Sequence, residues 1–367
     1  MEDVVKVAWS GRVGARQLRK VMEGAVWREL ALVETKTGGL ELVAVDGEPE
    51  KPVVVGRARA RAPLLDVKFY PRDAGMFLSA DAKGEVALFD TANMVVATQF
   101  RLGSGSAAHS LALPDCSAAA PLVAVGSGTG EVRLIDLRSG GFTHSMPNHA
   151  DVVTSLAFGS GDASVLVSGS ADGSICIYDI RRAGRLMTLD LALTSESGSA
   201  GPLDLPPGYV AGLAHHHGVS SLVMASNGAC LYSAGRDGAI RQWDMASGAN
   251  TLLNFGTFGG SLTLNSVPGT LALSPGDDVL YYPVARHGIG VFETSTGEHI
   301  DTLSAHFATI TGLTTLAFNH ILVSASTAGA VLLWAVPPPS PDAPDDLARL
   351  GWAPEDVDSD DSDWDAL

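Results

Sequence analysis

The sequence predicts an all-β fold, a propeller of seven short antiparallel sheets (its blades) repeated along the chain. One stretch, residues 156–182, contains three short apolar runs, at Leu156–Phe158, Val165–Gly169 and Ser174–Asp179. Asp172-Gly173 separates the last two runs, and an Asp-Gly pair between β-rich runs is a strong hairpin signal, expected here as a type I′ turn. These runs are apolar on nearly every residue, so each sheet needs neighbours of the same kind to cover both faces.

The same unit recurs along the chain. A turn glycine is followed five residues later by an aromatic or apolar residue in five places: Gly84 to Phe89, Gly130 to Ile135, Gly173 to Tyr178, Gly238 to Trp243 and Gly329 to Trp334. A sixth copy ends at Phe292-Glu293, one residue closer to its glycine, Gly288. Successive copies are 42–49 residues apart, except for one step of 65. A period near 40–45 residues with a terminal Trp-Asp is typical of WD repeats, in which each repeat forms one four-stranded blade.

A seventh copy is expected first, where Leu40–Asp46 ends 44 residues before Asp90 but lacks the turn spacing. We therefore expect a seven-bladed WD-repeat β-propeller with an eroded first blade, spanning residues 17–336. An N-terminal docking segment, 1–16, precedes it, and an acidic, disordered tail, 337–367, follows it.

The blades are expected in the following order. The first has strands near Trp27–Glu34, Leu40–Val45 and Pro52–Val55. The second to fourth blades occupy residues 64–103, 107–145 and 149–193. The fifth follows an insertion, and the sixth and seventh occupy residues 253–305 and 306–336. Trp334 is followed by Ala-Val-Pro-Pro-Pro, so the last blade lacks an outer strand of its own. Because an open sheet edge invites unwanted pairing, we expect Gln17–Met22 to fill that place and close the ring. Val4–Gly14 is expected either to form a partner-docking helix as well or to have no such role.

The step of 65 residues reflects an insertion, Thr194–His217, that is rich in Ser, Gly and Pro. It ends in three successive histidines, a sequence that suggests a metal site. Three neighbouring histidines in an extended segment cannot all face one ion, and no Cys, Asp or Glu flanks them closely. We therefore predict no metal and no other cofactor, and we interpret His217 as a repeat position.

That repeat position belongs to a group of polar side chains that can bond to one another inside a WD-repeat blade. In the fifth blade the expected group is His217, Ser233, Asp237 and Trp243. The fourth blade has Tyr178 in place of Trp, and the seventh has Ala328 in place of Asp. Buried polar groups of this kind are structural, and the chain shows no metal spacing, nucleophile motif or phosphate-binding glycine loop. We therefore expect a protein that is not an enzyme.

Charge and composition exclude further classes of function. The chain has a net charge of −17, made up of +2 in residues 1–61, −10 in residues 62–336 and −9 in residues 337–367. An acidic surface repels phosphate, so direct nucleic-acid binding is disfavoured. No apolar run approaches the ~20 residues that span a bilayer, so no membrane partner is expected. Cys116, Cys176 and Cys230 have no paired spacing, which favours reduced thiols in a cytosolic or nuclear protein.

Five segments carry a more specific resemblance: FYPRDAGM at 69–76, LVAVGSGTGEVRLIDLRSG at 122–140, SADGSICIYDIRRAG at 170–184, SGANTLLNFGT at 247–257 and VFETSTGEHIDTLSAH at 291–306. In this order, over residues 65–306, the chain resembles the Cockayne syndrome A family. The resemblance implies a nuclear substrate-recognition subunit of a cullin-4 RING ubiquitin ligase, acting in transcription-coupled nucleotide excision repair. It also implies docking on the large subunit of the damage-specific DNA-binding protein, with Cockayne syndrome B protein and RNA polymerase II as clients.

Receptors of this class share a Trp-Asp-x-Arg box at the end of a third strand. The resemblance places it at Tyr178, Asp179 and Arg181 with Arg182 adjacent, and a second copy at Ile135, Asp136 and Arg138. A strand-terminal Asp can hold an Arg in a bidentate pair and so present a fixed cation to a partner. A simple ion pair on the rim, with no partner, is the alternative.

The N-terminus departs from the family, because only Trp9 to Gly14, including Arg12, resembles the start of its longer docking segment. Adaptor docking would then rely more on the arginines of the third and fourth blades. The alternatives are that part of the interface has been lost or that the gene start is misassigned.

Overall fold

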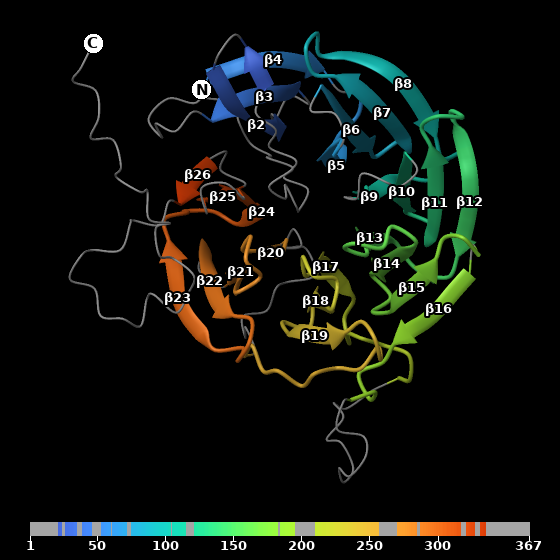
Figure 1. Ribbon diagram of the computed structural model, residues 1–367, viewed down its shortest axis with the longest axis vertical. Helices are drawn as coiled ribbons and strands as arrows, with labels where there is room; N and C mark the ends of the chain where they lie inside the picture. The colour runs from blue at the N-terminus through green and yellow to red at the C-terminus, as the bar shows by residue number, and fades with distance from the viewer. Residues whose placement is uncertain are drawn as a thin grey trace, which may run out of the picture.

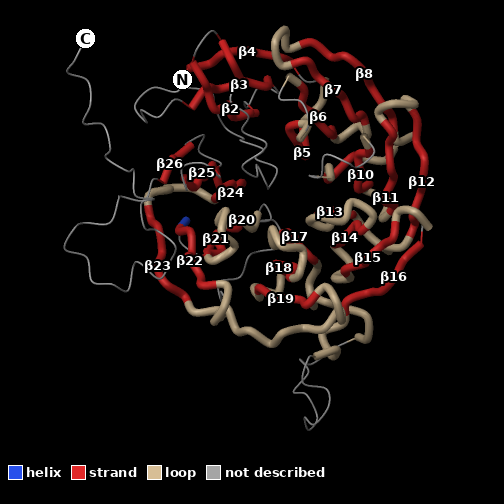
Figure 2. The backbone as a smooth tube through the Cα atoms, viewed as in Figure 1, coloured by secondary structure: helices blue, strands red, loops and turns tan. Residues whose placement is uncertain are grey.

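The computed structural model describes residues 21–23, 26–34, 39–45, 53–59, 61–71, 75–103, 105–114, 121–182, 184–194, 210–256, 270–284, 287–316, 321–326 and 331–334. The described strands form seven antiparallel sheets. Figure 1 shows these sheets set around a common axis like the blades of a propeller, and Figure 2 shows the strands joined by loops and turns. The expected all-β architecture of repeated sheets is therefore present.

The first three blades each contain four strands. The first blade consists of β1 (Val21–Glu23), β2 (Val26–Glu34), β3 (Gly39–Val45) and β4 (Val53–Arg59). The second consists of β5 (Leu64–Phe69), β6 (Met76–Asp81), β7 (Glu85–Asp90) and β8 (Val95–Arg101). The third consists of β9 (Ala108–Ala112), β10 (Leu122–Ser127), β11 (Glu131–Asp136) and β12 (Gly141–Pro147).

The remaining blades follow the same order. The fourth blade consists of β13 (Val153–Phe158), β14 (Val165–Ser170), β15 (Ile175–Asp179) and β16 (Gly184–Leu189), and the fifth of β17 (Val219–Met224), β18 (Cys230–Gly235) and β19 (Ile240–Asp244). The sixth consists of β20 (Ala272–Leu273), β21 (Val279–Val284), β22 (Gly288–Glu293) and β23 (His299–Ser304). The seventh consists of β24 (Ile310–Leu316), β25 (Ile321–Ser326) and β26 (Val331–Trp334).

The hairpin turn at Asp172-Gly173 is present, but the predicted type I′ conformation is wrong. Gly173 has a φ of 90°, whereas Asp172 does not have positive φ. The Gly173 N–H donates to the Ser170 carbonyl at 3.1 Å, which closes a type I turn followed by a left-handed glycine. Asp172 keeps the ordinary conformation because its carboxylate accepts from two backbone N–H groups, those of Ser174 and Ala150, each at 2.8 Å.

The first blade lacks the turn-glycine spacing of the other blades, but it has four strands. The predicted ring closure is wrong for Val21 and Met22, which pair with Arg28 and Trp27 of β2 and not with β26. Residues 17–20 lie outside the described residues, as do the segments 1–16 and 337–367. The strand β4 includes Gly56–Arg59, the first part of the basic run GRARARA.

The fifth blade has no fourth strand among its described residues, since an irregular segment lies along its outer side. There the Thr251 N–H donates to the Gln242 carbonyl of β19 at 3.0 Å. The Asn250 N–H donates to the Leu193 carbonyl at 2.7 Å, and Thr194 forms a parallel bridge with Asn250. Thr194, the residue at which the insertion is predicted to begin, therefore lies beside the outer edge of this blade.

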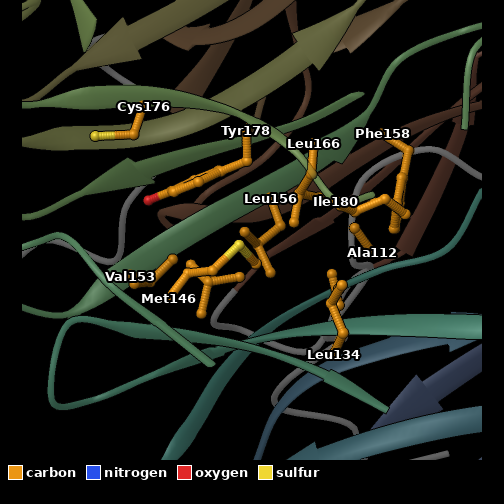
Figure 3. Close-up of a cluster of buried hydrophobic side chains, with 12 residues drawn as sticks. Ala112, Leu134, Met146, Val153, Leu156, Phe158, Leu166, Cys176, Tyr178 and Ile180 are labelled. Carbon is orange, nitrogen blue, oxygen red and sulfur yellow. The ribbon is translucent and has the colours of Figure 1, made fainter. Parts of the chain in front are cut away.

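Apolar side chains fill the space between neighbouring blades. Between the third and fourth blades, Leu134 and Met146 pack with Leu156, Leu166 and Tyr178, all nearly or fully buried (Figure 3). Such clusters lie on both sides of the second to sixth blades, as the uniformly apolar strands predicted. This burial makes the ring a rigid support for the side chains at its ends.

Polar side chains on the inner strands also join one blade to the next. The Ser110 hydroxyl donates to the Val153 carbonyl at 3.1 Å, and the Thr154 hydroxyl donates to the Val219 carbonyl at 2.7 Å. The Asp66 carboxylate accepts from the Leu111 N–H of the next blade at 2.7 Å and from the Val67 N–H at 2.9 Å.

Asp66 makes stability depend on pH. Burial raises the pKa of Asp66 to about 6, although Lys68 and the two backbone donors oppose the rise. The folded protein therefore binds a proton more tightly than the unfolded chain, whose carboxyl titrates near its ordinary value. Stability should rise as pH falls from above 6 towards 4, since protonation then relieves the burial of charge. Relative to Asp66→Asn, wild type should gain on the order of 2–3 kcal/mol across this range, measured by urea unfolding at each pH. Parallel stability curves for the two proteins would contradict this expectation.

The outer strands share one irregularity. Pairing between the third and fourth strands shifts register once in each of five blades, along β4, β8, β12, β16 and β23. In the fourth blade Ile177 pairs with Met187 and Tyr178 pairs with Arg185, which leaves Leu186 unpaired. Leu186 is therefore the extra residue of a β-bulge.

Candidate protein-docking site

The end of β15 presents a fixed cation. Arg181 Nε donates to Asp179 Oδ1 at 3.0 Å, and Arg181 Nη2 donates to Asp179 Oδ2 at 2.9 Å. The Arg181 backbone N–H also donates to Asp179 Oδ1, at 3.0 Å. The predicted bidentate pair is therefore present, and the short Asp-x-Arg spacing explains it because one carboxylate binds both parts of Arg181.

The two members of this pair differ in exposure. The Asp179 side chain is 6% exposed, whereas the Arg181 side chain is 70% exposed. The hydrogen bonds from Arg181 hold the pKa of Asp179 below its ordinary value. A second carboxylate, Asp162, lies close enough for its charge to act on Arg181. The site thus has a buried anionic base and an exposed guanidinium.

Two further residues of the predicted box have different positions. Arg182 lies beside the pair, with its Nε 3.8 Å from Asp179 Oδ2 and its side chain 81% exposed. Tyr178 is fully buried and accepts a hydrogen bond from Ser168 at 3.3 Å. The prediction that Tyr178 binds the adaptor is therefore wrong, because a partner cannot touch it. Tyr178 instead anchors the strand that carries Asp179.

The second copy of the box, in the third blade, is weaker. The Arg138 N–H donates to Asp136 Oδ1 at 2.8 Å, which lowers the pKa of Asp136. Among the described residues, no hydrogen bond or ion pair holds the Arg138 guanidinium, so the third blade lacks the bidentate pair of the fourth. Trp9 and Arg12, the other predicted adaptor contacts, lie outside the described residues.

At the opposite end of the fifth blade, the polar group forms around a different histidine from the one predicted. His215 Nε2 is 2.7 Å from Ser233 Oγ, and His215 Nδ1 is 3.0 Å from Asp237 Oδ1. Trp243 Nε1 donates to Ser233 Oγ at 2.8 Å. Ser233, Asp237 and Trp243 are therefore placed as predicted, but His217 is exposed and takes no part in the group.

Spacing within the chain could have identified His215. In the fourth and seventh blades the bonded histidine and serine are 19 and 18 residues apart, as His149 and Ser168 and as His306 and Ser324. His215 lies 18 residues before Ser233 and four residues before the start of β17, as the other two histidines lie four residues before their strands. The prediction of His217 chose the histidine nearest to the strand and did not use this spacing.

The fourth blade completes its group in a modified way. His149 Nε2 lies 2.6 Å from Ser168 Oγ, and His149 Nδ1 lies 2.8 Å from Ser174 Oγ. Ser174 Oγ in turn donates to Asp172 Oδ1 at 2.6 Å. Ser174 thus bridges His149 and Asp172 through two hydrogen bonds. Burial and hydrogen bonds to both ring nitrogens support the structural interpretation of His149 and His215.

Within the described ranges there is no group of three or more His, Cys, Asp or Glu side chains that could hold a metal ion. The rings of His216 and His217 lie beside each other on the surface, tilted by 36° with centroids 4.7 Å apart. Cys176 and Cys230 are free thiols, and Cys116 lies outside the described residues. No helix found in the described part of the chain is long and apolar enough to cross a membrane.

Comparison with known proteins agrees with this architecture. The family model for the WD domain, G-beta repeat, matches residues 140–179 and 209–244. The WD repeat-containing protein ATCSA-1 of Arabidopsis thaliana is 26% identical over 326 residues, which cover 73% of this chain and 70% of that protein. Ribosome biogenesis protein ytm1 of Neurospora crassa is 34% identical over 127 residues, 33% of this chain and 25% of that protein.

Among solved structures, a chain in the crystal structure of the mitotic checkpoint complex matches with a TM-score of 0.64 and 15% identity, over 84% of each chain. This likeness shows the fold alone. The chain carries WD repeats, is related to ATCSA-1 over most of its length and has the architecture of a typically non-catalytic scaffold family. The resemblance found from the sequence is thereby confirmed.

Proposed function

We propose that this WD-repeat protein is the substrate-recognition subunit of a cullin-4 RING ubiquitin ligase that acts in transcription-coupled nucleotide excision repair in the nucleus. It docks on the large subunit of the damage-specific DNA-binding protein. Cockayne syndrome B protein and RNA polymerase II are its clients. Its role is to bind and place proteins, while the other ligase subunits supply the catalysis.

The exposed, bidentate Arg181 is the observation that carries this proposal. A guanidinium held by a nearly buried carboxylate has already lost much of its conformational freedom, so a partner gains a preorganised contact. Arginines placed in this way are frequent hot spots of protein interfaces. Arg182 adds a second exposed cation beside it. Similarity to ATCSA-1 supports the family resemblance from which the box is taken.

Arg181→Ala should weaken the complex with the purified adaptor subunit at least ~10-fold, because truncation removes the fixed cation from the interface. The dissociation constant can be measured by titration calorimetry. Arg101→Ala is the matched control, since Arg101 is also exposed, at 74%, and also pairs with a carboxylate, that of Glu85 at 3.5 Å. This control lies in the second blade and should leave binding unchanged.

A generic scaffold for an unrelated complex is the competing function, favoured by the partial match to ribosome biogenesis protein ytm1. Affinity purification with mass spectrometry separates the two. Recovery of the cullin-4 ligase subunits supports a receptor, whereas their absence beside an abundant different complex supports the scaffold. Equal adaptor binding by wild type and Arg181→Ala would remove the box from the interface.

A further inference from the structure

Lysine is confined to the start of the chain. All six lysines lie within the first 83 residues, at Lys6, Lys20, Lys36, Lys51, Lys68 and Lys83. The rest of the chain, residues 84–367, contains ten arginines and no lysine. A general preference for Arg over Lys does not explain this boundary, because the first 83 residues hold six lysines beside eight arginines. The absence of lysine therefore belongs to one part of the molecule.

That part includes the whole of the third to seventh blades. Exposed cations do occur there, and they include Arg138 in the third blade and Arg182 and Arg185 in the fourth. Lysine and arginine supply the same positive charge to a surface, so charge alone gives no reason to exclude lysine. The two side chains differ in chemistry, since the lysine amine is the group to which ubiquitin is attached.

Attachment of ubiquitin needs a nucleophile. A neutral lysine amine attacks the carbonyl carbon of the thioester that joins ubiquitin to the cysteine of a conjugating enzyme. The isopeptide C–N bond forms as the C–S bond breaks, and the departing thiolate takes up the proton that the amine loses. The arginine guanidinium stays protonated and cannot act in this way. A receptor surface without lysine therefore offers no amine to the ligase that it belongs to.

Of the two lysines that the structure describes, one is well placed as an acceptor. Lys68 lies in β5, is half-buried and acts with its charge on Asp66. Lys83 is exposed, in the turn between β6 and β7 (Figure 1). Its backbone N–H donates to Asp81 Oδ1 at 2.9 Å, whereas no described residue pairs with its ammonium group. Lys83 thus presents a free amine from a fixed backbone.

The position of Lys83 keeps it clear of the candidate docking site. Lys83 lies in a turn that precedes a third strand, whereas Arg181 follows the end of one. Equivalent strands of successive blades run in the same direction around a propeller, so the two residues are at opposite ends of the ring. An adaptor bound at Arg181 therefore leaves Lys83 uncovered.

Resting on the ligase function proposed above, we propose that Lys83 is the site on the propeller at which the ligase attaches ubiquitin to its own receptor. The third to seventh blades escape this modification because they contain no lysine, although the ligase reaches them. Self-modification of the receptor is thereby limited to the start of the chain.

The test uses the full chain assembled with the adaptor and the cullin-4 and RING subunits, together with activating and conjugating enzymes, ubiquitin and ATP. Wild type should acquire ubiquitin at Lys83, seen as a diglycine remnant on that lysine after trypsin digestion and mass spectrometry. Lys83→Arg keeps the charge and should slow self-ubiquitination at least ~3-fold, because a tethered amine reacts at a high effective concentration.

Thr129 provides a matched position in the third blade. It is exposed and precedes Gly130 as Lys83 precedes Gly84. Thr129→Lys, added to Lys83→Arg, should restore the lost rate and place the remnant at position 129. Thr129→Arg, added in the same way, is the control and should not restore it. Both variants add one positive charge and lose the same hydrogen bond to Ser127 Oγ, so they differ in the amine alone.

Each contrary result overturns a stated part. An unmodified Lys83 in a ligase that binds the adaptor and discharges its conjugating enzyme would overturn Lys83 as the acceptor. Equal rates for Thr129→Lys and Thr129→Arg would show that the third blade lies beyond the reach of the ligase, which overturns the role of the missing lysines. Failure of the chain to bind the adaptor would instead overturn the ligase function itself, so the two failures are distinguishable.

Discussion

Replacing Asp237 by alanine is expected to destabilise the protein by about 3–5 kcal/mol, among the largest effects of any single polar substitution in the chain. Asp237 accepts from His215 Nδ1, from two backbone N–H groups and from Arg241 Nη1, the last at 2.9 Å. His215 is fully buried, and the Arg241 side chain is only 16% exposed. The substitution therefore leaves a buried cation and a buried imidazole without their anion.

The same contacts predict a pH dependence of opposite sign to that of Asp66. Burial alone would raise the pKa of Asp237, but the hydrogen bond and charge of His215, with Arg241, hold the pKa well below its ordinary value. The stabilisation is therefore present above the pKa of the unfolded chain, near 3.8, and is lost as pH falls below it.

Urea unfolding followed by tryptophan fluorescence measures both effects. Asp237→Ala should lose most of its stability deficit relative to wild type as pH falls from 5 to 2. Asp244→Ala is a suitable control, since Asp244 has local hydrogen bonds on the surface and no buried partner. A deficit below about 1 kcal/mol for Asp237→Ala, the size expected of a surface ion pair, would contradict a structural role for this group.

Gly173→Ala is expected to cost about 2–5 kcal/mol, since it combines two unfavourable terms. Gly173 has a φ of 90°, which an L side chain rarely adopts, and its missing Cβ would lie 2.2 Å from the His215 carbonyl oxygen. That oxygen cannot move freely, because the His215 N–H donates to the Gly173 carbonyl at 3.0 Å. The substitution would therefore also displace the histidine of the fifth blade.

Gly161→Ala separates the two terms. Gly161 has a similar φ of 79°, but a Cβ there would meet open space. This variant should cost about 1–2 kcal/mol from backbone strain alone. The difference between the free energies of unfolding of the two variants, measured in urea, gives the contribution of the steric clash. Equal losses of stability would show that the backbone around His215 moves to accept the Cβ without a loss of free energy.

The repeat made most of the fold predictable. Sheet-forming runs such as Val165–Gly169 agree with β14 within one residue, because buried strands between turn glycines leave little freedom. The bidentate Arg181 was also predictable, since two residues of separation allow one carboxylate to reach both donors of the arginine.

Features that depend on the packing of one blade against another were not predictable in this way. His215 is not one of these features, because the 18-residue spacing that links His306 to Ser324 also links His215 to Ser233 and identifies it. The burial of Tyr178 depends on packing between the third and fourth blades. The pairing of Met22 with β2 shows that nearby strands compete successfully with a distant edge, since a short loop loses less entropy on closure.

The bulges along the outer strands bear on how the protein avoids self-association. A propeller exposes many strand edges, each with backbone groups that a foreign chain could extend into a longer sheet. In β16 and β23 the extra residues are Leu186 and Ile300, and each interrupts the regular ladder near the middle of its strand. An approaching strand can match one side of the interruption but not both, so fibre-like growth from the rim stops after a few residues.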